Sequence, residues 1–78
     1  MNNKIAKVMA KAFEVPQESI TTLSSQDNIS AWDSLHHVKM IVFLEREFDI
    51  TIPDDDVSKM LSYKLIELTV NKCLNETE

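Results

Sequence analysis

The stretch that decides the fold spans residues 32–48 and reads WDSLHHVKMIVFLEREF. Its apolar residues recur at helical spacing and cover a wide arc, with Glu45 expected on the outer side. They are Leu35, Val38, Ile41, Val42 and Phe48, with Met40, Phe43 and Leu44 beside them. Such breadth indicates a helix that contacts several others, or one with an additional exposed apolar patch. Either Asp33 or Ser34 can cap its start, so we predict a helix over residues 34–48.

Apolar residues at the same spacing predict a first helix upstream. They are Ile5, Val8, Met9, Ala12 and Phe13. Asn2 or Asn3 can cap its start. Pro16 ends it, because the residue before a proline is disfavoured in helical conformation.

Two further helices are predicted downstream. The carboxylates of Asp54, Asp55 and Asp56 suit the first turn of a short third helix, since they complement its dipole. Its apolar side consists of Val57, Met60 and Leu61. Ser62 can cap a last helix. One face of that helix carries Leu65, Ile66, Thr69, Val70, Cys73 and Leu74.

Residues 16–32 are rich in Ser, Thr, Gln, Asn and Asp and predict a long ordered loop. Ile20, Leu23 and Ile29 are expected to anchor it to the core. A loop of this length in a small domain usually serves a function. Residues 50–53 read as an extended connection, with a weak β tendency that is too short for a sheet.

The composition fits an all-α fold. Glycine is absent from the 78 residues, whereas tight hairpins, phosphate-cradling loops and dinucleotide-binding motifs depend on glycine. We therefore predict a single domain over residues 1–78. It is a four-helix bundle of three longer helices and a short third one, with a long loop between the first and second helices.

The charge and the apolar runs limit the partners and the location. A net charge of −5 argues against nucleic-acid binding, which needs clustered Lys and Arg, and suits partners with basic surfaces. The longest apolar run, residues 40–44, is too short to span a bilayer, so we expect no stable membrane insertion. The start lacks the apolar region of a signal peptide. Cys73 is the only cysteine, which excludes an internal disulfide. We expect a cytoplasmic protein.

Ser34 is the candidate functional residue. It stands at the first turn of the predicted second helix, directly after the long loop, where its hydroxyl would face solvent. A helix N-terminus favours anions through its free N–H groups and its dipole, so a phosphodiester on this oxygen would be well placed. The alternative is that Ser34 only caps the helix.

The order of motifs around Ser34 resembles that of the acyl and peptidyl carrier protein family. Asp33-Ser34-Leu35 matches the tripeptide that holds the family's modified serine, and Val38, Leu44-Glu45-Arg46-Glu47-Phe48 and Ile52-Pro53-Asp54 follow in the family's order. Upstream, Val15-Pro16-Gln17-Glu18-Ser19-Ile20 is similar to the family's loop after the first helix. The resemblance covers nearly the whole chain, whose length fits a single free-standing carrier.

The resemblance implies that Ser34 carries 4′-phosphopantetheine. A separate phosphopantetheinyl transferase would take this group from coenzyme A, with Ser34 Oγ attacking the pyrophosphate, and Asp33 and Leu35 would help that enzyme dock. Acyl groups would then ride on the terminal thiol as thioesters, and the flexible arm would raise their effective concentration at acyl-loading and acyl-transferring enzymes. We expect a monomer that is a carrier and not an enzyme.

The surface after Ser34 departs from the family pattern. Fatty-acid carriers are usually strongly acidic there, whereas this chain has His36, His37 and Lys39, and Arg46 interrupts the later acidic run. Trp32 replaces a small or aliphatic residue, and Trp-Asp-Ser-Leu is similar to carriers of specialised pathways. We therefore favour a carrier with its own partners over a general one.

Other candidate sites have simpler explanations. A hydrolase would pair Ser34 with His37, but the chain lacks the glycine-bearing turn such sites need. We expect His36 and His37 to face solvent, and one of them to help neutralise a phosphate on Ser34. Residues 54–56 lack the spacing of a calcium loop.

Cys73, Met40 and Met60 read as core residues, although the methionines could instead line a cavity for an acyl chain. Two alternative functions remain. One is a peptidyl or aminoacyl carrier, and the other is an unmodified helical interaction domain.

Overall fold

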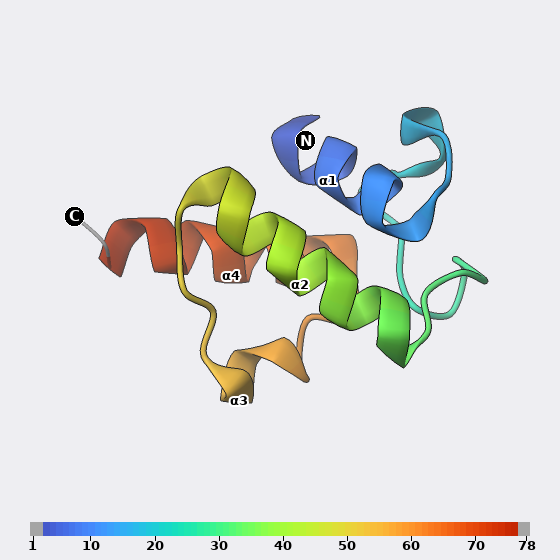
Figure 1. The fold of residues 1–78 in the computed structure, drawn as a ribbon. Coiled ribbons are helices and arrows are strands. Elements are labelled where there is room, and N and C mark those ends of the chain that lie inside the picture. The colour runs from blue at the N-terminus through green and yellow to red at the C-terminus, as the bar shows by residue number, and fades with distance from the viewer. Residues whose placement is uncertain (1–2, 77–78) are drawn as a thin grey trace.

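A computed structural model describes residues 3–76, and its helices confirm the predicted all-α bundle (Figure 1). In chain order these are α1 (Asn3–Phe13), the 3₁₀ helix η1 (Gln17–Ser19), α2 (Ser34–Phe48), α3 (Asp54–Val57) and α4 (Tyr63–Glu76). The described residues form no strand, and Ser25 and Ser62 make only an isolated bridge. Residues 50–53 are thus a connection without helix or strand, as predicted, and Pro53 has extended backbone angles.

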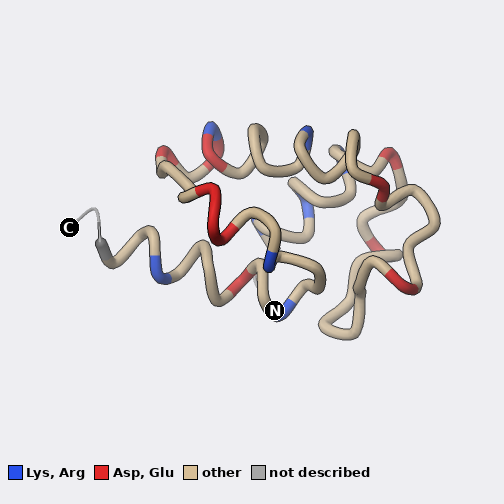
Figure 2. The backbone as a smooth tube through the Cα atoms, turned by 90° about the horizontal axis from the view of Figure 1, so that it is seen from below, with Lys and Arg blue, Asp and Glu red and all other residues tan. Residues whose placement is uncertain are grey.

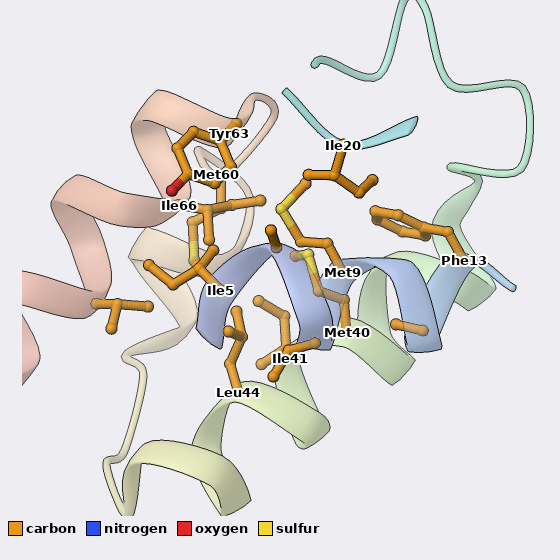
Figure 3. Close-up of a cluster of buried hydrophobic side chains, with 14 of the residues drawn as sticks. Ile5, Met9, Phe13, Ile20, Met40, Ile41, Leu44, Met60, Tyr63 and Ile66 are labelled. Atoms are coloured by element: carbon orange, nitrogen blue, oxygen red, sulfur yellow. The ribbon is translucent and has the colours of Figure 1, made fainter. Parts of the chain in front are cut away.

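One hydrophobic core holds α1, α2 and α4 together (Figure 3). The apolar face of α1 is buried along its length, from Ile5 to Phe13. Met40 and Met60 are fully buried, so both fill the core as predicted. Complete burial of a side chain such as Leu44 stabilises the fold by about 1.5–3 kcal/mol. The hydrophobic effect therefore fixes α2 against both of its neighbours.

The long loop is held by polar as well as apolar contacts. Ile20 is buried and Ile29 is partly buried, but the prediction for Leu23 is wrong because that side chain is 75% exposed. Ser24 is buried in its place. Its hydroxyl accepts the Thr21 N–H at 2.8 Å, and its carbonyl accepts the Tyr63 N–H at 2.8 Å. The second of these bonds ties the loop to the start of α4.

Several predicted positions differ in detail. The third helix ends at Val57, so Met60 is buried beyond it, while Leu61 faces outward. Glu45 was expected to lie outside, but it is half-buried because its Oε2 accepts the Ile52 N–H at 2.9 Å. On α4, Leu65 is exposed, while Ile66, Val70 and Cys73 are buried and Leu74 is partly buried.

The structure bears on the predicted caps of α4 and α1. Ser62 caps α4, since its hydroxyl accepts the Leu65 N–H at 3.3 Å. Of the two predicted caps of α1, Asn2 lies outside the described residues, and Asn3 is the first described residue of that helix.

Helices α1 and α2 are each followed by a residue other than glycine in the left-handed conformation. Glu14 has φ 58° at the end of α1, and Asp49 has φ 53° at the end of α2. Each turn is closed by a backbone bond, from Val15 N–H to the Ala10 carbonyl at 3.0 Å and from Ile50 N–H to the Glu45 carbonyl at 3.1 Å. Such positions ordinarily favour glycine, which this chain lacks.

Candidate functional site

The N-terminus of α2 lies at the end of the molecule where the long loop gathers (Figure 1). Asp33 caps the helix: its Oδ1 accepts the His36 N–H at 2.9 Å, and its carbonyl accepts the His37 N–H at 2.9 Å. The His36 ring Nδ1 lies 2.7 Å from the same Oδ1. The His36 backbone N–H, and after it the His36 ring, lower the pKa of the Asp33 carboxyl below its ordinary value. Asp33 is therefore an ionised cap.

Ser34 does not cap α2, because Asp33 does so. It is the first residue of α2 and is exposed, and its hydroxyl makes no hydrogen bond to any residue in the described range 3–76. The N–H groups of Ser34 and Leu35 likewise find no acceptor within that range. An anion attached to Ser34 Oγ would therefore meet free donors at a helix N-terminus.

His37 does not face solvent, contrary to the sequence prediction. The indole N–H of Trp32 donates to His37 Nδ1 at 2.9 Å, and His37 Nε2 lies 2.7 Å from the Val57 carbonyl oxygen. Because an indole N–H can only donate, Nδ1 is the acceptor and Nε2–H donates to Val57. The ring thus links the residue before the Asp33 cap to the end of α3. We call this arrangement of Trp32, His37 and Val57 the indole–imidazole clamp.

Trp32 is the buried end of the clamp. It is 3% exposed and packs against Phe13 of α1, with ring centroids 4.7 Å apart. The planes of the Trp32 and His37 rings are only 19° apart and their centroids lie 6.1 Å apart, as the hydrogen bond between the ring edges requires. Sequence reasoning noted Trp32 as unusual but missed the clamp, because Val57 lies 20 positions after His37. A tryptophan just before the helix, followed five positions later by a histidine, was the available signal.

His36 also has partners rather than facing open solvent. Its Nε2 lies 3.6 Å from Glu14 Oε2, and Lys39 Nζ lies 3.9 Å from the same oxygen. Glu14 therefore joins the C-terminal end of α1 to the first turns of α2. With His36 engaged by Asp33 and Glu14, and both nitrogens of His37 in use, neither imidazole is positioned as a general base for Ser34.

An exposed apolar stripe begins beside Ser34. Leu35 is 74% exposed and Val38 57% exposed, and Val42 continues the stripe at helical spacing. Of the two predicted explanations for the apolar breadth of α2, an exposed patch is thus present. Lys39 and Arg46 lie along one edge of the stripe, as their positions on the helix require.

The other residues considered as sites are the possible metal ligands and Cys73. No group of three or more metal-ligating side chains occurs within residues 3–76. Cys73 is buried and its thiol lies 3.6 Å from the Thr51 carbonyl, so it is the core residue that was predicted. No described helix is long and apolar enough to cross a membrane.

Comparison with known proteins identifies the family. No family model matches the chain. An acyl carrier protein of Buchnera aphidicola subsp. Schizaphis graminum is 42% identical over 64 residues, which cover 77% of this chain and 80% of that protein. A solution structure of holo acyl carrier protein from Geobacter metallireducens superposes with a TM-score of 0.83 at 26% identity, covering 95% of this chain and 85% of that one. The predicted resemblance is confirmed: the chain belongs to the acyl carrier protein family.

Proposed function

We propose that Ser34 is the residue of this acyl carrier protein to which 4′-phosphopantetheine is attached. Members of the family carry acyl groups and are not enzymes, and phosphopantetheine is their prosthetic group. When bound, that group supplies a terminal thiol that holds acyl chains as thioesters. One observation carries the assignment to Ser34: its hydroxyl is exposed and unbonded because Asp33 performs the capping.

The residues around Ser34 fit a phosphodiester. The N–H groups of Ser34 and Leu35 would donate to its oxygens, and the helix dipole would favour its negative charge. His36, two residues after Ser34, is the imidazole that would contribute further positive charge, since both nitrogens of His37 are bonded in the clamp. We therefore expect His36, and not His37, to help neutralise the phosphate.

Loading followed by intact mass tests the assignment. The wild-type protein is incubated with coenzyme A and a broad-specificity phosphopantetheinyl transferase. We expect a gain of one phosphopantetheine, no gain for Ser34→Ala, and a normal gain for Ser30→Ala, which changes an exposed serine in the preceding loop. No gain in the wild type would point to an unmodified helical interaction domain. A gain that persists in Ser34→Ala would refute the site.

The partners of the loaded arm would dock on the apolar stripe of Leu35, Val38 and Val42. An exposed apolar patch beside a modified residue is a natural contact for the transferase and for acyl-loading and acyl-transferring enzymes. Because the cations Lys39 and Arg46 border it, partners with acidic rims fit better than those with basic patches. This favours a carrier with dedicated partners. Leu35→Glu and Val38→Glu should slow loading in the same assay while the helical content stays unchanged.

The oligomeric state and the compartment belong to the same proposal. We expect a monomer, checked by light scattering of the loaded protein. A cytoplasmic location agrees with the short apolar runs and the single buried cysteine, and cell fractionation tests it. The cargo is to be identified by isolating the loaded protein from its native source and determining the thioester.

A further inference from the structure

Basic residues gather where α1 and α2 face one another, although the chain as a whole carries a net charge of −5. α1 contains three lysines and no acidic residue. Lys7 and Lys11 of α1 and Arg46 of α2 line a shallow pocket of about 290 Å³ together with Val8, Phe43 and Glu47. We call these six residues the cationic groove. Figure 2 shows basic positions on α2 with acidic positions beside them, and the continuous acidic run of α3.

The cations of the groove are not neutralised within the molecule. None of the ion pairs among residues 3–76 involves Lys7, Lys11 or Arg46. Glu47 is the one carboxylate among the lining residues. Neighbouring like charges raise the local potential and attract an oppositely charged surface. The groove is therefore electrostatically complementary to carboxylates, although the chain as a whole is acidic.

An aromatic ring gives the groove an apolar element. Phe43 is half-buried, and the ammonium groups of Lys11 and Lys39 lie 5.5 Å and 5.7 Å from the centre of its ring. Both ammonium groups thus lie over the ring, and the Phe43 ring and Val8 are the apolar members of the lining. A ligand that fits must combine carboxylates with at least one apolar side chain.

The volume of the groove favours a protein segment over a small molecule as its ligand. Drug-sized ligands occupy clefts of about 300–1,000 Å³ that bury most of their surface. This pocket lies at the lower limit, and its charged side chains are exposed. A few side chains projecting from a partner's helix match it better than an enclosed ligand does.

We propose that the cationic groove is a second docking surface, which binds an acidic helix of a partner protein with one apolar residue against Phe43. The groove does not include Ser34, Leu35, Val38 or Val42, and Arg46, which follows Val42 by one helical turn, borders both surfaces. The inference does not depend on whether Ser34 is modified.

A designed peptide provides the probe. It is a helix with glutamates at i, i+4 and i+7 around a central leucine, titrated into isotope-labelled protein while the amide chemical shifts are followed. We expect shifts concentrated on α1 and the second half of α2, and binding that weakens as salt is raised. The same peptide with glutamine at every glutamate should bind at least about tenfold more weakly.

Variants of the protein locate the contact. Lys7→Glu with Arg46→Glu should reduce the affinity for the acidic peptide by at least about tenfold. Lys64→Glu, which reverses an exposed charge on α4 outside the groove, should bind as wild type. Equal binding of the glutamine peptide, shifts confined to the apolar stripe, no binding at low salt, or binding to phosphatidylserine vesicles in place of the peptide would each overturn the proposal.

Discussion

Replacing His37 with alanine removes the centre of the indole–imidazole clamp, and the structure allows its cost to be worked out. The Trp32 indole N–H would lose its acceptor while staying buried, which costs about 1–3 kcal/mol for an unsatisfied donor. The bond to the Val57 carbonyl contributes about a further 1 kcal/mol. We expect the free energy of unfolding to fall by about 2–4 kcal/mol, a large share of the total for so small a domain.

Equilibrium urea unfolding followed by far-ultraviolet circular dichroism measures this loss. Trp32→Phe removes the indole donor, so the double variant with His37→Ala should cost less than the sum of the two single variants. The difference should be about 1 kcal/mol or more, because the two residues share one hydrogen bond. A loss below about 0.5 kcal/mol for His37→Ala, or strict additivity, would refute the clamp. His36→Ala, whose partners Asp33 and Glu14 are exposed, is the contrasting variant and should cost less.

Two further predictions concern the ends of α2. Asp49→Gly should raise the free energy of unfolding by about 1 kcal/mol, since it relieves a left-handed φ of 53° and removes a negative charge from a helix C-terminus. Asp49→Asn should gain less, and a glycine variant no more stable than wild type in urea would contradict the explanation. The pKa of Asp33 is lowered in the folded protein, so its contribution is complete above the ordinary value of 3.8 and disappears as the pH falls through the folded value. Asp33→Asn, which keeps a capping oxygen, should therefore lose less stability than wild type on acidification, and parallel urea midpoints in a pH series would count against this.

Much of the fold follows from spacing along the sequence. Apolar residues recur at helical period from Ile5 to Phe13 and again along α2. Pro16 indicates the end of the first helix and Asp33 the start of the second. The position of Ser34 at a helix start follows from the same signals. Local rules suffice there because the interacting residues are only a few positions apart.

The errors arise where distant segments meet. Leu23 was expected in the core by composition, but the backbone bond from the Tyr63 N–H to the Ser24 carbonyl fixes the path of that loop. His37 was expected in solvent, but its partners come from the loop and from the end of α3. Hydropathy and periodicity do not encode such long-range polar pairings, so the structure was needed to find them.

The burial of Trp32 has a practical consequence. It is the only tryptophan of the chain, it lies two positions before Ser34, and its indole is bonded to His37 and packed on Phe13. Its fluorescence should therefore report changes in the contact between α1, the loop and the start of α2. The protein thus carries an intrinsic optical probe beside its proposed attachment residue, with which arm attachment, cargo loading and partner binding can be followed in real time without any label.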